Sequence, residues 1–261
     1  NKEINEILRC IKTVVRKKKI GLHEPIIGNL EKNEINKCIE SGYISTSGNY
    51  HTKQFEKKIK SIVKSNHVIA TINGTSAIHI ALKIIGVEEN NEVLIPSFNF
   101  IAAANAVLYC RAIPHFIDIE KDNIFIDPNK LETYLKNNFI KKKNRTINKK
   151  TKNVVKAIIP FHTFGHSCKI YKLKKIADSY NIKVIEDAAE ALGSYYKNKH
   201  LGTFGQIGIL SFNGNKIVTT GGGGAILTNN NLIAKNARKM IQVSKIPHKW
   251  KFKYKEIGYN Y

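Results

Sequence analysis

The feature that most constrains the fold is a regular alternation of strand patterns and helix patterns from residue 67 onward. Short runs of β-branched residues recur at 67–72, 92–95, 112–117, 154–159, 183–185, 207–212 and 225–227. Helix patterns separate several of them, for example at 77–85 and 170–180. Strands that alternate with helices favour an α/β fold whose central sheet is mostly parallel and covered on both faces. Residues 137–153, rich in Lys and Asn, interrupt the alternation, and we expect an exposed insertion or a long loop there.

The chain divides into three segments by pattern. Residues 1–50 hold two helix patterns, at 1–15 and 30–39, and a stretch at 41–49 rich in Ser, Gly and Asn that indicates a loop. A Lys-rich helix pattern at 54–64 opens the large α/β domain, to which we assign residues 51–245. Residues 246–261 stop in mid-pattern, so we expect a truncated chain in which they begin a small C-terminal domain that is largely missing.

The composition excludes several classes of protein. The chain carries 43 Lys and Arg against 20 Asp and Glu, a formal net charge of +23, but only five of these bases are Arg. Because Arg is the usual base-reading residue, we expect no specific nucleic-acid partner. No apolar run approaches the roughly 20 residues that cross a bilayer, and no secretory signal is recognisable, so we expect a cytoplasmic protein without a membrane partner. The four cysteines lack metal-ligand spacing, which indicates reduced thiols and no metal site.

Two short motifs follow predicted strands, where open α/β sheets bind their ligands. The first, N-G-T-S at 73–76, opens a helix pattern. Its backbone N–H groups and hydroxyls suit a phosphate, although helix capping by Thr75 or Ser76 explains the motif as well. The second, E-D-A-A-E at 186–190, ends a strand pattern in two adjacent carboxylates. An acid such as Asp187 can hold a positive ring nitrogen or a metal there. The alternative is a strand-end cap, and this role is sufficient to explain Glu186.

A lone lysine, Lys216, stands between a strand pattern that reaches Ser211 and a glycine run, T-T-G-G-G-G at 219–224. The spacing fits neither a P-loop nor a dinucleotide-binding turn, because the lysine precedes the glycines. A lysine beside apolar strands suits Schiff-base chemistry, since burial favours its neutral form. The alternative is that Lys216 is one more surface lysine.

The order of these motifs resembles that of the pyridoxal-phosphate sugar aminotransferases of the DegT/DnrJ/EryC1/StrS family. The shared elements are the G-T-S turn, P-S-F-N-F at 96–100, E-D-A-A-E, the S-F-x-x-N-K segment, T-T-G-x-G-G and G-Y-N-Y at 258–261. The likeness spans about residues 23–261. It implies the aspartate-aminotransferase-like fold (fold type I) and pyridoxal 5′-phosphate as the cofactor.

The resemblance also implies a role for each motif residue. Lys216 would hold the cofactor through its amine and move the proton between substrate and cofactor. Asp187 would keep the pyridine nitrogen protonated, so that the ring acts as an electron sink. The residues that would hold the cofactor phosphate are Gly74, Thr75, Ser76 and Ser211.

Three further residues take roles from the resemblance. Phe100 would stack on the cofactor ring, although core packing explains such an aromatic as well. Glu190 stands where many relatives carry Gln and would lie near the ring. Asn260 would reach the cofactor phosphate of a partner subunit, which implies a homodimer with shared active sites.

Finer motifs are similar to those of the aminotransferases of the legionaminic-acid pathway: L-H-E-P at 22–25, P-F-H-T-F-G-H at 160–166, S-F-N-G-N-K followed by four glycines, and P-H-K-W at 247–250. The implied reaction transfers an amino group from L-glutamate to the C4 ketone of a UDP-linked 2-acetamido-2,6-dideoxy-hexos-4-ulose. His162 is a candidate polar contact of the site or a structural histidine.

Three alternatives stay open. The perosamine synthases, which use a GDP-linked 4-keto sugar, are the nearest similar branch. A dehydratase branch of the family replaces the Schiff-base lysine by histidine, and the presence of Lys216 speaks against it. A truncated remnant without activity of its own is the third.

Overall fold

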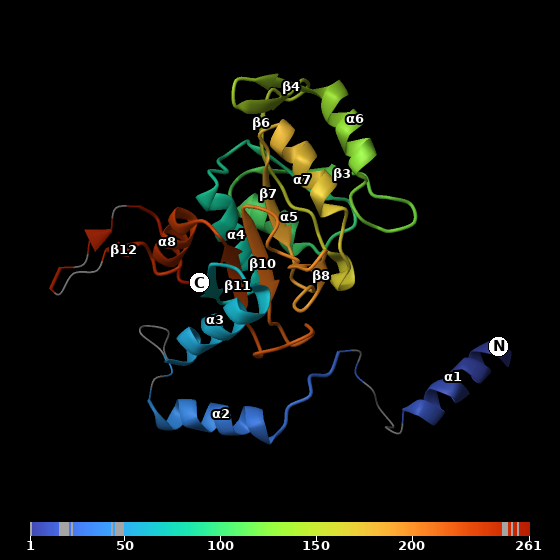
Figure 1. The fold of residues 1–261 in the computed structure, drawn as a ribbon, viewed down its shortest axis with the longest axis vertical. Helices are drawn as coiled ribbons and strands as arrows, with labels where there is room; N and C mark the ends of the chain where they lie inside the picture. The colour runs from blue at the N-terminus through green and yellow to red at the C-terminus, as the bar shows by residue number, and fades with distance from the viewer. Residues whose placement is uncertain are drawn as a thin grey trace.

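A nine-stranded, mostly parallel sheet lies at the centre of the part of the chain that the structure describes (Figure 1). The computed structural model describes residues 2–15, 21, 23–42, 44, 50–246, 250–251, 253–254 and 256–261. Seven strands follow one another in the order β1-β11-β10-β7-β6-β2-β3. Their bounds are β1 His67–Thr71, β2 Glu92–Pro96, β3 Ile113–Ile117, β6 Val154–Ile158, β7 Lys183–Asp187, β10 Ile207–Ser211 and β11 Gly224–Thr228.

Strand direction confirms the predicted α/β class. β10, β7, β6, β2 and β3 run parallel to one another, and β11 is antiparallel to both of its neighbours, β10 and β1. β1 therefore points the same way as β10. The carboxyl ends of six strands thus meet at one edge of the sheet.

Helices cover both faces of the sheet. One apolar core joins the strands to α4 Gly74–Ile84, α5 Ala102–Tyr109 and α8 Asn231–Met240. The other core joins them to α3 Tyr50–Val63, α6 Pro128–Asn138 and α7 Ile170–Ser179. Neighbouring strand residues alternate between the two cores, as Val184 and Ile185 do, because successive side chains of a strand point to opposite faces. This explains why the strands are apolar throughout instead of alternating with polar residues.

The segment 137–153 is mostly exposed, as expected, but the expectation of a long loop there is wrong. The segment contains the end of α6 and a hairpin of β4 Phe139–Lys142 and β5 Arg145–Asn148, and β5 pairs with β6. Phe139 and Thr146 are buried, 4% and 0% exposed, while the lysines of the segment face outward. The high Lys and Asn content concealed a strand pattern of which only one side is apolar.

A buried carboxylate fastens this hairpin to the sheet. Glu92, at the start of β2, is 1% exposed and accepts hydrogen bonds from Asn148 Nδ2 at 2.9 Å and from Thr151 Oγ1. His115 Nδ1 lies 2.8 Å from Oε2, the oxygen that Asn148 also contacts at 2.9 Å. Burial acts to raise the pKa of Glu92, but the hydrogen bonds of His115, Asn148 and Thr151 outweigh it and hold that pKa below its ordinary value.

Two helices and two short strand pairs of the described residues lie outside the central sheet. α1 Lys2–Val14 and α2 Asn29–Glu40 lie apart from it in Figure 1 and contain no buried residue. The short strand pairs are β8 Tyr195–Tyr196 with β9 Lys199–His200, and β12 Lys245–Ile246 with β13 Lys253–Tyr254. Within the described ranges, no helix is both long and apolar enough to cross a membrane. Parts of the predicted loop at 41–49 and of the motifs at 22–25 and 247–250 fall outside the described residues.

The last residues pack on α4 and α8. Tyr259 donates its backbone N–H to Met240 at 2.7 Å, and its ring lies 4.7 Å from the ring of His79 on α4. Tyr261 OH lies 3.2 Å from Nδ1 of the same histidine. Burial, assisted by the charge of Lys83, lowers the pKa of His79 to about 4, so this contact holds a neutral imidazole near pH 7.

Candidate active site

The candidate site forms where the carboxyl ends of β1, β10, β7 and β6 lie side by side. Register fixes this alignment: Gly224 of β11 pairs with both Thr71 and Ser211, and Asp187 pairs with Ile209 on one side. On its other side Asp187 bridges to Phe161, just after β6. The predicted motifs after these strands, far apart in the sequence, are thereby brought to one edge of the sheet.

The first part of the site is a close-packed cradle at the start of α4. Asn73 caps the helix, and its Oδ1 accepts the N–H of Ser76 at 2.8 Å. A methyl group on Gly74 would lie 3.2 Å from the Cβ of Ser211, and one on Gly224 would lie 2.4 Å from the carbonyl carbon of Asn73. Glycine is therefore required at position 224, where two backbones approach closely, and Gly74 packs tightly against Ser211.

The structure corrects the capping interpretation of the N-G-T-S motif. Asn73 caps the helix, not Thr75 or Ser76, because the residue before the first helical turn is the one whose side chain can reach the free N–H groups. Because the cap uses the N–H of Ser76, a phosphate at this helix end would depend on the amides of Gly74 and Thr75 and on the hydroxyls of Thr75, Ser76 and Ser211.

The second part is the side chain of Lys216, which is 14% exposed. Its Nζ lies 3.1 Å from Oε1 of Glu190. The loop that carries Lys216 is anchored by Phe212, which is fully buried and packs edge-on against Phe55 with ring centroids 4.9 Å apart. Backbone bonds from Phe212 to Gly223 and from Thr220 to Phe212 close the loop. Lys216 is thus a partly buried lysine held by its surroundings and differs from the exposed surface lysines.

The third part is Asp187, at the end of β7 and 4% exposed. Burial raises its pKa to about 6; the N–H of Ala189 and the charges of Lys216 and His162 act in the opposite direction, and the charge of Glu190 adds to the rise. Asp187 is therefore ionised near pH 7, close enough to Lys216 to respond to its charge. A cationic ring nitrogen is the kind of group that such a buried carboxylate holds.

Glu186, the neighbouring acid, anchors the strand end. Its carboxylate is fully buried and accepts the backbone N–H groups of Gly202 at 2.9 Å and of Phe204 and Gly205 at 2.5 Å. Nε2 of His162, also fully buried, lies 3.0 Å from it. These contacts occupy the polar atoms of Glu186 and the Nε2 atom of His162. His162 is therefore a structural histidine that stabilises the end of the strand that carries Asp187.

Two predicted site residues lie at the surface. Phe100, after β2, is 66% exposed. Asn260 is exposed and its backbone bridges to Gln242, next to α8. Among the described residues neither forms a hydrogen bond or ion pair with Lys216 or Asp187.

Sequence reasoning missed the turn that follows β6. Phe164 donates its N–H to Oε2 of Glu190 at 2.8 Å and adopts a left-handed conformation with φ 52°. The only local signal for such a turn is the glycine that follows, Gly165, whose φ is also positive.

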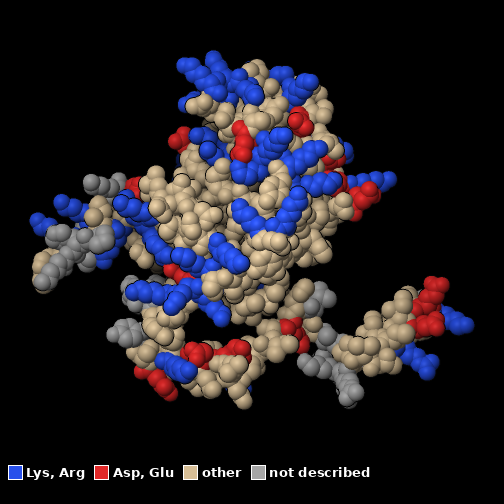
Figure 2. Space-filling model, viewed as in Figure 1, with Lys and Arg blue, Asp and Glu red and all other residues tan. Residues whose placement is uncertain are grey.

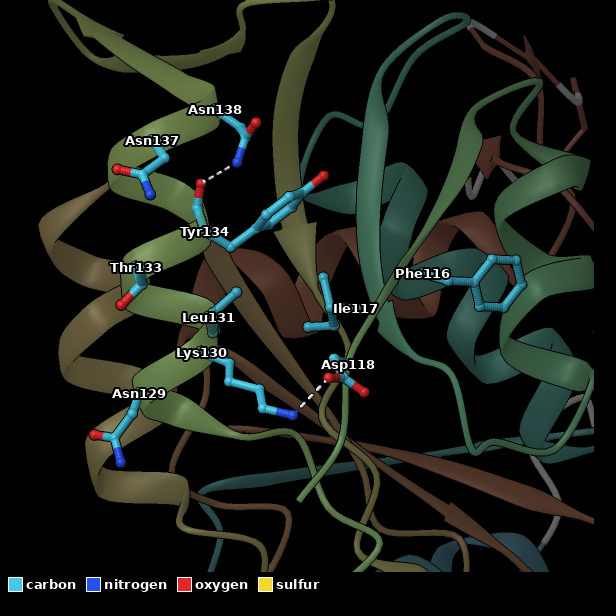
Figure 3. Close-up of a pocket in the computed structure, with 10 residues that line it drawn as sticks. All are labelled: Phe116, Ile117, Asp118, Asn129, Lys130, Leu131, Thr133, Tyr134, Asn137 and Asn138. Atoms are coloured by element: carbon cyan, nitrogen blue, oxygen red, sulfur yellow. Dashed lines mark hydrogen bonds and ion pairs between the residues drawn. The ribbon is translucent and has the colours of Figure 1, made fainter. Parts of the chain in front are cut away.

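A well-formed cavity of the described surface lies elsewhere. A cavity of about 660 Å³ opens between β3 and α6 and contains none of the predicted site residues (Figure 3). Its charged side chains, Lys130 and Asp118, neutralise each other in an ion pair of 2.7 Å. On the face that Figure 2 shows, Lys and Arg are spread widely, with acidic side chains between them.

The residues at the carboxyl edge fit pyridoxal phosphate. The cradle of glycines and hydroxyls at α4 suits the phosphate, the buried carboxylate of Asp187 suits the ring nitrogen, and the amine of Lys216 suits the aldehyde. All three lie at the same edge of the sheet: the cradle after β1, Asp187 at the end of β7 and Lys216 in the loop after β10.

Comparisons with known proteins agree with this assignment. The pattern of the DegT/DnrJ/EryC1/StrS aminotransferase family matches residues 25–261. The GDP-perosamine synthase of Escherichia coli O157:H7 is 38% identical over 206 residues, 78% of this chain and 51% of that protein. The GDP-perosamine synthase of Caulobacter vibrioides is 34% identical over 243 residues, 93% of this chain and 61% of that protein.

Solved structures show the same fold. A DegT/DnrJ/EryC1/StrS aminotransferase from Brucella abortus superposes with a TM-score of 0.80 at 30% identity, over 89% of this chain and 59% of that one. Helicobacter pylori PseC, an aminotransferase involved in the biosynthesis of pseudaminic acid, has a TM-score of 0.81 at 24% identity, over 94% of this chain and 62% of that one. The chain thus spans between half and two thirds of the length of these proteins. It belongs to the DegT/DnrJ/EryC1/StrS family of pyridoxal-phosphate-dependent sugar aminotransferases.

Proposed function

We propose that this protein is a nucleotide-sugar aminotransferase. It transfers an amino group, from L-glutamate, to the C4 ketone of a UDP-linked 2-acetamido-2,6-dideoxy-hexos-4-ulose, for the synthesis of a legionaminic-acid-like surface glycan. The observation that carries the proposal is the placement of Lys216 and Asp187 at neighbouring strand ends beside the cradle of Gly74 and Ser211.

Each residue of the site has a defined task in this reaction. When bound, pyridoxal phosphate supplies a ring that withdraws electrons from the substrate carbon. Nζ of Lys216 binds the aldehyde end and moves the proton at the substrate carbon. The carboxylate of Asp187 keeps the ring nitrogen protonated, and Gly74, Thr75, Ser76 and Ser211 hold the phosphate.

The remaining predicted residues orient the cofactor. Phe100 stacks on the ring, and its exposed side chain is available to do so. Glu190 lies next to Lys216 and therefore near the ring.

A homodimer with shared sites forms part of the proposal, with Asn260 reaching the cofactor phosphate of a second copy. The loops around the site expose large apolar side chains, and such a patch typically marks an interface. They are Ile72, Phe98, Phe100, Ile101, Ile217 and Val218. The test is complementation: mixing a Lys216→Ala variant with an Asn260→Ala variant restores part of the activity only if sites are shared between copies.

The first experiment is an absorption spectrum of the protein with pyridoxal phosphate. We expect a visible band that disappears in Lys216→Ala, persists in a control at the exposed surface lysine of α8, Lys235→Ala, and bleaches when glutamate is added. A band that is unchanged in Lys216→Ala contradicts the assignment of the lysine.

A second candidate function is that of a perosamine synthase, because several relatives, among them the two described above, carry that name. The substrates of the two candidate functions differ in the nucleotide and in the 2-acetamido group of the sugar. Turnover of the UDP-linked and the GDP-linked 4-keto sugar, compared at equal concentration by mass spectrometry of the product, distinguishes them. An inactive remnant turns over neither.

A further inference from the structure

The carboxylate of Glu190 contacts two separate loops of the site. Oε1 of Glu190 lies 3.1 Å from Nζ of Lys216, in the loop after β10. Oε2 accepts the backbone N–H of Phe164 at 2.8 Å, in the turn after β6. Glu190 itself belongs to the turn after β7, the strand between those two. It is the direct link between the reactive lysine and the turn that holds Phe164.

The turn that Glu190 holds is strained. Phe164 lies at φ 52° and ψ 26°, a left-handed conformation that is unfavourable for a residue with a side chain, and its ring is 71% exposed. Gly165 follows at φ 80°, and a methyl group there would lie 2.7 Å from the carbonyl oxygen of Glu190. The surrounding structure must therefore maintain this conformation. Backbone hydrogen bonds from Gly165 to His162 and from His166 to Thr163 close the turn, and the bond from Phe164 to Glu190 ties it to the turn after β7.

The charge of Lys216 keeps Glu190 in place. Glu190 is 26% exposed and shares its surroundings with the buried Asp187, whose ionisation it opposes. Without the positive charge of Lys216, Asp187 and Glu190 oppose each other's ionisation, and of the two positive charges that favour ionised Asp187 that of His162 remains. Glu190 has solvent within reach, so it is the one free to leave, and Phe164 then loses its acceptor.

We propose that Glu190 is a positioning residue that couples the charge of Lys216 to the conformation of the Phe164 turn: loss of that charge releases Glu190 and, with it, the turn at 163–165. The inference deepens the proposed function and rests on it for its biological meaning, since capture of a carbonyl compound converts the ammonium group of Lys216 into an imine, which has no charge when it is unprotonated. The exposed ring of Phe164 would then move in response to occupation of the site.

The coupling is tested in the protein without cofactor, by hydrogen exchange of peptides that cover residues 161–168. We expect Lys216→Met, which removes the charge, to accelerate exchange at the Phe164 amide by about ten-fold or more, and Lys216→Arg, which keeps the charge, to restore the protection of the original protein. Lys235→Met on α8 is the matched control and is expected to change nothing.

Glu190→Gln separates the two contacts. The carboxylate contacts Lys216 through Oε1 and Phe164 through Oε2; a glutamine is uncharged and has an NH₂ donor in place of one of these oxygens, so it cannot reproduce both contacts. We expect faster exchange in this variant and no additional acceleration when Lys216→Met is combined with it, because both changes act through one link. Additive effects of the two substitutions would overturn the proposal, as would a Lys216→Met variant whose Phe164 amide stays protected.

Addition of pyridoxal phosphate connects the coupling to function. We expect the exchange of the 161–168 peptides in the cofactor-loaded original protein to increase as the pH rises and the visible band changes to that of the unprotonated imine, and to remain unchanged in Glu190→Gln at equal cofactor occupancy. A missing band refutes the proposed function and leaves the exchange results on the variants intact. A band without any change in exchange refutes the coupling alone.

Discussion

Replacement of Asp187 by Asn is expected to stabilise the protein while it weakens cofactor binding. Burial raises the pKa of Asp187 from its usual 3.8 to about 6. At about 1.36 kcal/mol per pH unit, ionising this group in the folded protein costs about 3 kcal/mol at pH 7. Asn keeps the acceptor for the N–H of Ala189, which lies 3.2 Å from Oδ1, and removes the buried charge.

The sign of the effect depends on pH in a defined way. The folded state binds the proton of Asp187 more tightly than the unfolded state, so the stability contributed by this group is fully present below about pH 3.8 and is lost as the pH rises through about 6. The gain from Asp187→Asn is therefore expected to be up to about 3 kcal/mol at pH 7 and below about 1 kcal/mol at pH 4.

Urea unfolding of the cofactor-free protein between pH 4 and pH 7.5 measures this difference. Asp178→Asn is the control, because this acid is exposed on α7 in an ion pair with Lys174 and is expected to change stability by less than about 0.5 kcal/mol. With saturating pyridoxal phosphate, the gain of Asp187→Asn is expected to shrink, since the original protein binds the cofactor more tightly. A gain that is the same at pH 4 and pH 7 would refute the reasoning.

Three further predictions concern packing and reactivity. Gly208→Ala is expected to unfold at a clearly lower urea concentration than Gly214→Ala. An added methyl group would lie 1.8 Å from a backbone carbonyl oxygen at position 208, whereas it would meet open space at position 214. Equal unfolding midpoints of the two variants would contradict the close approach at Gly208. Glu92→Ala is expected to cost about 3 kcal/mol and to increase hydrogen exchange in β4–β5, because it leaves the buried donors of the hairpin unpaired; unchanged exchange there would show that the hairpin does not need this anchor. Cys110, whose pKa is raised to about 11 by burial, is expected to react with iodoacetamide only after unfolding, whereas Cys10 is exposed and reacts at once, as mass spectrometry of the labelled peptides can measure.

Much of the candidate site could be predicted from the sequence because its residues follow strands. Asp187, Ser211 and the G-T-S turn each end a run of apolar residues that local pattern alone identifies as a strand. A parallel sheet places such ends together whatever the order of its strands. The resemblance of the motifs to those of a known family predicted which cofactor these strand ends would hold. The match of the family model over residues 25–261 confirmed that family.

The hairpin at 139–148 and the Glu190 link could not be predicted in the same way. In the hairpin only one side of each strand is buried, and lysines on the other side dilute the apolar signal. The link between Glu190, Lys216 and Phe164 joins residues separated by 26 positions on each side. Nothing in the local sequence marks such a contact.

The sequence by itself determined the period of each element, the apolar faces of the helices and the positions at which chemistry-bearing residues follow strands. Only the tertiary structure decided that β7 lies between β6 and β10, and this order is what places Glu190 within reach of both neighbouring loops. The physical reason is that periodicity is a property of consecutive residues, whereas strand order follows from the simultaneous burial of two apolar cores on opposite faces of one sheet.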